Sequence, residues 1–431
     1  MSLFEADLAR GRQWSRIGDA YEVTRKPRGL SLSEFPAVPF AAMEAIPQGG
    51  AYLPEFTMKA PKTIASGTYF ERGDVLVSKI TPSFENGKQA LIRELAVPFG
   101  YATTEVIPLH PRSTQHDPRL VFFYLLHPDV RSYIAERMEG STGRQRVPES
   151  VLLDVPMPLL EHSDQISIAD ALEAMQRAST AESMCERFSL ELKQATMRAL
   201  FTRGLRGEAQ KETEIGPGPR SWMRTPIASL GRIITGNTPP TNDPTNYVGG
   251  EIPFTAPGDI EHGRPITMSE KRITAKGLKS VRPIEAGATC VVCIGSSIGK
   301  VGYVTSGLCA TNQQINSVLP YGEFNSPYVF HLITYWADYV RSHASPSPVP
   351  ILSKGVLEKL EVLSTTDKDE QQEIANILDA IDRKIDLHRR KRAILDKLFK
   401  ALLHKLMTGE IRVADLDLSS LTAIPPTETA A

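Results

Sequence analysis

Three short stretches of the chain hold residue types that could do chemistry. Asn237-Thr238-Pro239-Pro240 has the letters of the Asn-Pro-Pro motif with which adenine methyltransferases hold a flipped base, but in the wrong order and with no aromatic residue following. Cys290-Val-Val-Cys293 has the spacing of two zinc ligands, but the chain has no second pair and these two lie in an apolar run. "GSSIGK" (residues 295–300) is close to a phosphate-binding loop, but valine follows the lysine where a Walker A motif needs Ser or Thr. These stretches therefore predict neither catalysis nor a metal, and we expect no cofactor.

The polar residues of such stretches suit contacts to DNA better. A turn of small residues after a strand brings backbone N–H groups close to phosphates, with Ser296, Ser297 and Lys300 as further donors. Arg and Gln side chains form paired hydrogen bonds with guanine and adenine edges, which makes "STGRQR" (residues 141–146) and "TNQQ" (residues 311–314) candidates for base contacts. The candidate DNA-binding residues are Lys79, Lys88, Arg144, Gln145, Arg146, Thr235, Asn237, Ser296, Ser297, Lys300, Asn312 and Gln313. The alternative for each is ordinary turn and capping chemistry.

The strongest basic run is "HRRKR" (residues 388–392). Its simplest interpretation is a solvated face of a helix. The alternatives are contact with a DNA backbone or with an acidic partner surface.

The elements that must position these residues occur twice. "DQISIADALEAMQR" from Asp164 and "EQQEIANILDAIDR" from Glu370 are identical at six of fourteen positions at an offset of 206. Other features repeat in the same order: an opening tryptophan, a Gly-bearing turn into an apolar strand, an "AT" segment, and a short helix after a proline. We interpret this order as a duplication of a unit of about 200 residues.

Each repeat begins with many short strands and ends in a long helix. Residues 163–203 and 367–407 contain no proline. In the second helix, apolar residues at alternating steps of three and four predict a packing seam: Ile374, Leu378, Ile381, Ile385, Leu395, Phe399, Leu402 and Leu406. In the first helix the corresponding seam is Ile168, Leu172, Met175, Phe188, Leu192, Ala195 and Ala199. Helices of this length are roughly 60 Å long, and each is the natural partner of the other.

The totals describe an ordinary globular protein. The chain has 431 residues, 41% hydrophobic and 23% charged, and a net charge of −1, which neither predicts nor excludes DNA binding. We expect no membrane span, because no apolar run approaches 20 residues, and no signal peptide at the charged N-terminus. Four cysteines suit a reducing cytosol, so a cytoplasmic location is expected.

Six pieces of the chain match a known family: "TGNTPP" (residues 235–240), "IPFTAPGDI" (252–260), "IGSSIGKVG" (294–302), "TNQQINSV" (311–318), the lead into the first long helix (141–166), and the terminal helix from Asp369. Through these pieces the sequence resembles the specificity subunits of type I restriction-modification systems. The first half departs from the pattern, with "TRKPRGLSL" (residues 24–32) where a "TGNTPP" turn would stand.

The resemblance implies an α+β fold in which two α/β target recognition domains are separated by two long antiparallel coiled-coil helices. The expected divisions are recognition domain 1 at 1–160, a spacer helix at 161–206, a linker at 207–221, recognition domain 2 at 222–365, a second spacer helix at 366–410 and a flexible tail at 411–431. The implied partners are double-stranded DNA, two methyltransferase subunits and a restriction/translocase subunit, and the chain itself would not be an enzyme.

Two other functions remain open on the sequence alone. One is a self-contained methylase or nuclease with a coiled-coil spacer, against which the missing catalytic motifs speak. The other is a scaffold of a related phage-defence complex.

Overall fold

A computed structural model describes residue 3 and residues 13–49, 54–141 and 143–416. The chain divides into two compact units. Unit 1 comprises residues 1–182 and 390–431, and unit 2 comprises residues 183–389. The recognition domains expected at 1–160 and 222–365 therefore lie inside these units, and each unit adds half of each long helix.

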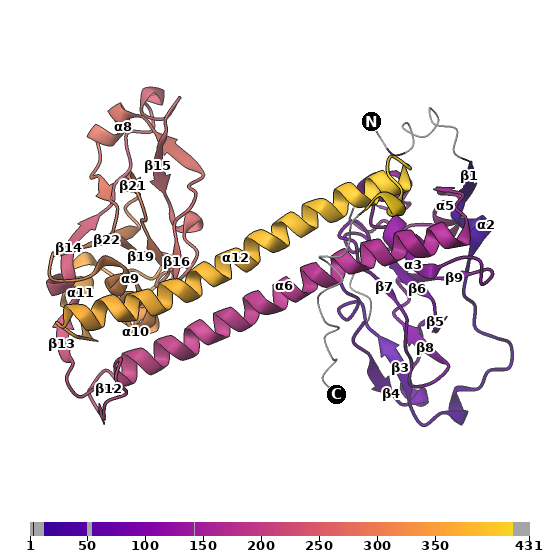
Figure 1. The fold of residues 1–431 in the computed structure, drawn as a ribbon, viewed down its shortest axis with the longest axis horizontal. Coiled ribbons are helices and arrows are strands. Elements are labelled where there is room, and N and C mark those ends of the chain that lie inside the picture. Colours follow the sequence, from indigo (N-terminus) through magenta and orange to yellow (C-terminus); the bar gives the residue numbers. More distant parts are fainter. Residues whose placement is uncertain (1–2, 4–12, 50–53, 142, 417–431) are drawn as a thin grey trace. The chain divides into compact units, whose positions relative to one another are not determined.

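Both long helices are confirmed. Helix α6 (His162–Arg203) and helix α12 (Lys368–Met407) each pass from one unit into the other (Figure 1). Asp367 starts α12 by accepting hydrogen bonds from the backbone N–H of Asp369 and Glu370, at 2.9 and 3.2 Å. Such a cap satisfies N–H groups that have no partner within the helix.

The two helices pack antiparallel in both units, as predicted. Contacts between them run in opposite directions along the two chains. The pairs and their closest distances are Ser179–Asp396 at 2.7 Å and Glu182–Lys391 at 3.6 Å in unit 1, and Glu186–Arg389 at 2.6 Å and Lys193–Asp382 at 2.7 Å in unit 2.

The seam predicted on α12 is largely confirmed, but part of the seam predicted on α6 is wrong. Four α6 residues assigned to it are exposed: Phe188, Leu192, Ala195 and Ala199. Between residues 186 and 200, the buried residues of α6 are Glu186, Ser189, Lys193, Met197 and Leu200. Three of these five are polar, and two of them, Glu186 and Lys193, form ion pairs with Arg389 and Asp382 of α12, so the apolar pattern pointed to the wrong face.

The strands of unit 1 form two four-stranded sheets, in the orders β2-β9-β6-β7 and β4-β3-β8-β5, and a separate antiparallel pair β1-β10. Among the described strands of unit 1, only β3 and β8 pair in parallel. The strands are β1 Trp14–Arg16, β2 Tyr21–Val23, β3 Val38–Ala41, β4 Thr57–Lys59, β5 Thr68–Glu71, β6 Val75–Ser78, β7 Gln89–Leu91, β8 Phe99–Ala102, β9 Val106–Pro111 and β10 Pro156–Pro158. The short helices are α2 Ile17–Ala20, α3 Pro118–Tyr124, α4 Pro128–Ala135 and α5 Glu149–Leu153.

Unit 2 repeats this plan. Its sheets have the orders β14-β22-β19-β20-β16 and β17-β15-β21-β18, with an antiparallel pair β13-β23. The strands are β13 Met223–Pro226, β14 Gly231–Thr235, β15 Ile252–Thr255, β16 Arg264–Pro265, β17 Lys271–Ile273, β18 Ile284–Glu285, β19 Thr289–Val292, β20 Val301–Tyr303, β21 Leu308–Thr311, β22 Ile315–Pro320 and β23 Glu361–Ser364. The short helices are α7 Ile227–Leu230, α8 Ala275–Lys279, α9 Ser326–Tyr335, α10 Ala337–Ser342 and α11 Lys354–Lys359.

The duplication extends to single hydrogen bonds. Gln165 and Gln371 correspond in the repeat. Each accepts a hydrogen bond from the backbone N–H of the residue that caps the N-terminus of a short helix, α3 in unit 1 and α9 in unit 2. The donors are Asp117, at 3.0 Å, and Asn325, at 2.8 Å. Each glutamine also donates to a carbonyl just before its own long helix. The identical glutamines therefore tie each long helix to its domain in the same way.

The first sheet of each unit is covered on both faces. In unit 2, Val291 and Val318 join α9 and the long helices in one core, while Cys290 and Ile315 join the second sheet in another. A strand buried on both sides needs a continuous apolar run, which explains "TCVV" in β19 and "VLV" in β6.

Two predicted loose segments are partly structured. The linker at 207–221 contains a small hairpin of β11 (Gln210–Lys211) and β12 (Gly218–Pro219). The tail expected to be flexible packs Ile411, Val413 and Leu416 on the core of unit 1, and residues 417–431 lie outside the described residues. Among the described helices, none is long and apolar enough to cross a membrane.

Candidate nucleic-acid interface

In unit 1, the loop after β6 lies against the loop before α5. The backbone N–H of Val147 donates to the carbonyl of Lys79 at 2.8 Å, and that of Thr81 donates to the carbonyl of Gln145 at 3.0 Å. Positive φ angles at Gly140 and Gly143 shape the second loop. The structure therefore brings together Lys79, Gln145 and their neighbours, which are about 65 residues apart in sequence.

The arginines of this second loop differ in their freedom. Arg146 makes a two-bonded ion pair with Glu105, at 2.8 and 2.9 Å, and this pairing lowers the pKa of Glu105. Arg144 is exposed on the turn. Lys88 donates to the carbonyl of Met43 at 2.8 Å, so its ammonium already has a partner within the domain. Of these three, Arg144 is the best placed for contact with a ligand.

In unit 2, the "GSSIGK" loop occupies the equivalent place after β19. Gly295 and Gly299 have φ near +90°, a conformation that favours glycine. The N–H of Gly295 donates to the carbonyl of Pro350 at 3.0 Å, which joins this loop to the one before α11. Ser296 is exposed, and Ser297 and Lys300 are partly exposed. A turn of this kind offers N–H, hydroxyl and ammonium donors to a phosphate.

The other candidates of unit 2 gather beside this loop but serve each other. Asn312 bonds to Gln314 through both side-chain amide atoms, at 2.9 and 3.0 Å. Gln313 accepts from the hydroxyl of Thr238 at 2.9 Å. These side chains support the shape of the loop, and a contact with a base would replace some of these bonds.

Thr235 and Asn237 likewise support the "TGNTPP" turn. The hydroxyl of Thr235 donates to Asn316 at 2.7 Å. Asn237 accepts from the backbone N–H of Arg282 at 3.0 Å and donates to the carbonyl of Ser280 at 3.2 Å. The turn is therefore built into the domain by residues more than 40 positions away.

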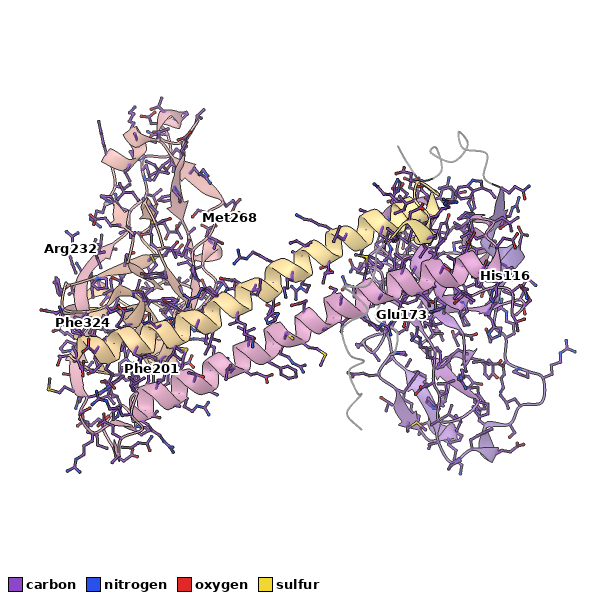
Figure 2. All side chains as sticks on the ribbon, viewed as in Figure 1. His116, Glu173, Phe201, Arg232, Met268 and Phe324 are labelled. Atoms are coloured by element: carbon purple, nitrogen blue, oxygen red, sulfur yellow. The ribbon has the colours of Figure 1, made fainter. Side chains whose placement is uncertain are left out.

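The sequence did not single out a hollow of about 660 Å³ beside this turn. It is lined by residues from β14, from the segment before β18, from β18 itself and from α11. Three of them are cations, Arg232, Arg282 and Lys354, and one is an anion, Glu285. Figure 2 labels Arg232, which is exposed on the edge strand β14. Its place between Gly231 and Ile233 in an alternating strand indicates an outward side chain, but nothing local indicates that the three cations meet.

Two tempting stretches have structural roles. Cys290 and Cys293 are buried, and burial raises the pKa of both thiols to about 11, which disfavours the thiolate that binds metals. In "HRRKR", Arg389 pairs with Glu186 and Glu261, and Lys391 pairs with Glu182. This run therefore joins α12 to α6, and Arg389 also joins α12 to the segment at Glu261 within unit 2.

A family model described as "Type I restriction modification DNA specificity domain" matches residues 219–397. The chain is 31% identical over 206 residues to the type I restriction enzyme MjaIX specificity subunit of Methanocaldococcus jannaschii, a match that covers 46% of this chain and only 47% of that protein. It is 26% identical over 353 residues to the putative MjaX specificity subunit of the same organism, covering 79% of each.

Solved structures share the fold. The type I S subunit from M. genitalium aligns with a TM-score of 0.59 at 13% identity, over 92% of this chain and 97% of that one. A chain from a study of complex assembly and conformational transition in the type I system aligns with a TM-score of 0.56 at 16% identity, over 93% and 99%. By its family model and its relatives, the chain is similar to the specificity subunits of type I restriction-modification systems, and it shares their fold of two domains joined by two long helices.

Proposed function

We propose that each half of the chain reads one half of a split, asymmetric DNA sequence. The recognition domains are residues 1–160 and 222–365. The observation that carries the proposal is that the same sheet order is built twice, with a small-residue loop after the equivalent central strands β6 and β19. Two similar readers on one chain suit a bipartite site, as paired readers in other DNA-binding proteins suit paired half-sites.

The candidate contacts fall into two groups. The first group offers donors that are at least partly exposed: the backbone of the two loops with Lys79, Arg144, Gln145, Ser296, Ser297 and Lys300, joined by Arg232 at the hollow. Arg282 and Lys354 line the same hollow but already bond to the carbonyl of Thr235 and to Glu358. The second group, which supports the loops and would contact DNA only after exchanging internal bonds, is Lys88, Arg146, Thr235, Asn237, Asn312 and Gln313. Cations near phosphates supply affinity, while base-edge contacts supply specificity.

The long helices would dock the methyltransferase subunits. Five large apolar side chains on them are about half exposed: Phe188 at 51%, Leu192 at 49%, Leu387 at 48%, Ile394 at 56% and Leu398 at 51%. Phe188 with Leu192, and Ile394 with Leu398, are each four residues apart and so share a helix face, which supports two apolar patches that a partner covers. Two methyltransferase subunits and a restriction/translocase subunit would perform the chemistry, and this chain would be non-catalytic.

The helices would also set the gap between the two half-sites. Four extra residues in each helix, after Glu182 in α6 and after Arg389 in α12, add one turn, or about 6 Å. This is the rise of roughly two base pairs at 3.4 Å each. The recognised gap should widen by one or two base pairs while both half-sites stay the same; altered half-sites would contradict the spacing role.

Methylome sequencing tests the main proposal. A host carrying this chain with its methyltransferase should show methylation within a bipartite motif, and a continuous motif would contradict two independent readers. Purified chain alone should take up no labelled S-adenosylmethionine. Uptake, or methylation of DNA by the isolated chain, would instead support a self-contained methylase.

A further inference from the structure

A buried ion network joins domain 2 to both long helices in unit 2. The ammonium of Lys193, on α6, donates to both carboxylate oxygens of Asp382, on α12, at 2.7 and 2.8 Å, and to the carbonyl of Gly263 at 2.9 Å. Arg264, on β16, donates to the same carboxylate at 2.9 Å and also pairs with Asp386. Lys193, Arg264 and Asp382 are only 6%, 5% and 7% exposed.

Around this network lies a more exposed pair of bonds between the same elements. Arg389, on α12, binds Glu186 of α6 at 2.6 Å and Glu261, next to β16, at 2.8 Å. Three separate segments therefore meet through charges: α6, α12 and the segment from Glu261 to Arg264. Burying ions is costly, and in some proteins a buried ionic group serves a unique arrangement rather than stability.

The corresponding positions of unit 1 do not form this network. At the offset of 206, Phe399 corresponds to Lys193 and Gln176 corresponds to Asp382. Phe399 packs on Phe123, with ring centroids 6.0 Å apart. The sheet β2-β9-β6-β7 has no counterpart of β16 among the described strands of unit 1.

Unit 1 has its own ion pairs at other positions. Arg119 and Arg93 both bind Glu173 of α6, at 3.1 and 2.7 Å. At the offset of 206, Glu173 corresponds to Asp379, which bonds to His331 of α9 at 2.8 Å, so this acidic residue has a counterpart in unit 2. The network of Lys193, Asp382 and Arg264 has none at the corresponding positions of unit 1, so the shared fold does not require it. This difference points to orientation rather than to folding as the role of the buried ions.

We propose that Arg264 is a positioning residue that, held by Lys193 and Asp382, fixes the angle at which recognition domain 2 sits on the helix pair. Its planar guanidinium reaches two carboxylates on successive turns of α12, which a point charge cannot do equally well. Its effect on DNA spacing rests on the proposed function, but its effect on orientation does not.

Distance measurement in the full chain tests orientation directly. Cys185, on α6, is the one exposed cysteine among the four, and Met268, labelled in Figure 2, is 79% exposed in domain 2. In an M268C variant, spin labels on Cys185 and at position 268 should give a narrow distance distribution in double electron–electron resonance. R264M should broaden or shift this distribution, and R264K should restore it in part.

The matched control is R224M. Arg224 also binds two carboxylates, Glu214 and Glu361, each at 2.6 Å, but it is exposed and neither partner lies on a long helix. It should leave the distribution unchanged. If R264M proves too unstable to label, D382N removes the shared acceptor charge and should give the same broadening. An unchanged distribution in a folded R264M or D382N chain overturns the proposal.

A second measurement reads the consequence in the complex with the methyltransferase. R264M should methylate sites with a gap one base pair too long or too short nearly as well as the native site, while its half-site preference stays the same. If the distance distribution changes but no variant recognises a bipartite site, the proposed function fails and the orientation role stands. If the distribution stays unchanged while the native chain keeps its bipartite site, only the orientation role fails.

Discussion

Two phenylalanines on α6 should respond to truncation in opposite ways. Phe201, labelled in Figure 2, is fully buried. Its ring packs against those of Tyr335, Trp222 and Tyr328, with centroids 5.1, 6.0 and 6.2 Å away. Phe188 is 51% exposed, although the apolar pattern had assigned it to the seam. F201A removes a packed aromatic ring and leaves a cavity, whereas F188A removes a ring that is mostly in water.

The expected losses in the free energy of unfolding differ enough to distinguish a buried ring from an exposed one. A buried Phe→Ala change costs about 3–5 kcal/mol in the free energy of unfolding. For a unit of this size, this lowers Tm by about 6–20 °C. A surface change costs about 0.5 kcal/mol or less. F188A should instead weaken capture of the methyltransferase subunit, because it removes part of the apolar surface that we assign to that partner.

Urea unfolding read by tryptophan fluorescence checks both values. Trp222 and Trp336 lie in unit 2 and Trp14 lies in unit 1, so a W14F background makes the signal report on unit 2. A loss below about 1 kcal/mol for F201A would refute the assigned core, on the scale of buried aromatic truncations. A loss above about 2 kcal/mol for F188A would refute its exposure, since surface changes cost far less.

Three further predictions concern pH, the repeated glutamines and DNA affinity. Burial lowers the pKa of His127 to about 4, so on acidification the unfolded chain takes up this proton before the folded chain does. The free energy of unfolding should therefore fall by at most about 3 kcal/mol as pH drops from about 6.5 to 4. H127Q should flatten this part of the profile of unfolding free energy against pH. Q371L and Q165L each remove the partner of a buried backbone N–H, so each should cost about 1–3 kcal/mol in urea unfolding. K300A should reduce DNA affinity in the assembled complex and lower the slope of log affinity against log salt by about 0.9, whereas an unchanged slope would remove Lys300 from the phosphate contacts.

Several features of the fold could be predicted because their signals are local. Forty residues without proline, with an aspartate cap at Asp367 and regular apolar spacing, are enough to define α12. The duplication is equally visible, since identical residues such as Gln165 and Gln371 must make the same bond to the same kind of helix cap.

The candidate site was only partly predictable. The loops after β6 and β19 were identified by their small and basic residues, but which side chains are free in them depends on distant partners. Glu105 occupies Arg146, and residues 280–282 bind the turn at Asn237. Arg282 and Lys354 come to the same hollow from segments more than 70 residues apart.

The sequence by itself therefore determined the repeated architecture, the two long helices and the resemblance to specificity subunits. Only the tertiary structure decided which face of α6 is buried, which ions fasten each domain to the helices, and which polar residues remain exposed. The physical reason is range. Helix propensity, capping and apolar spacing act over one or two turns, whereas a buried lysine such as Lys193 is tolerated only because Asp382, 189 residues away, neutralises it.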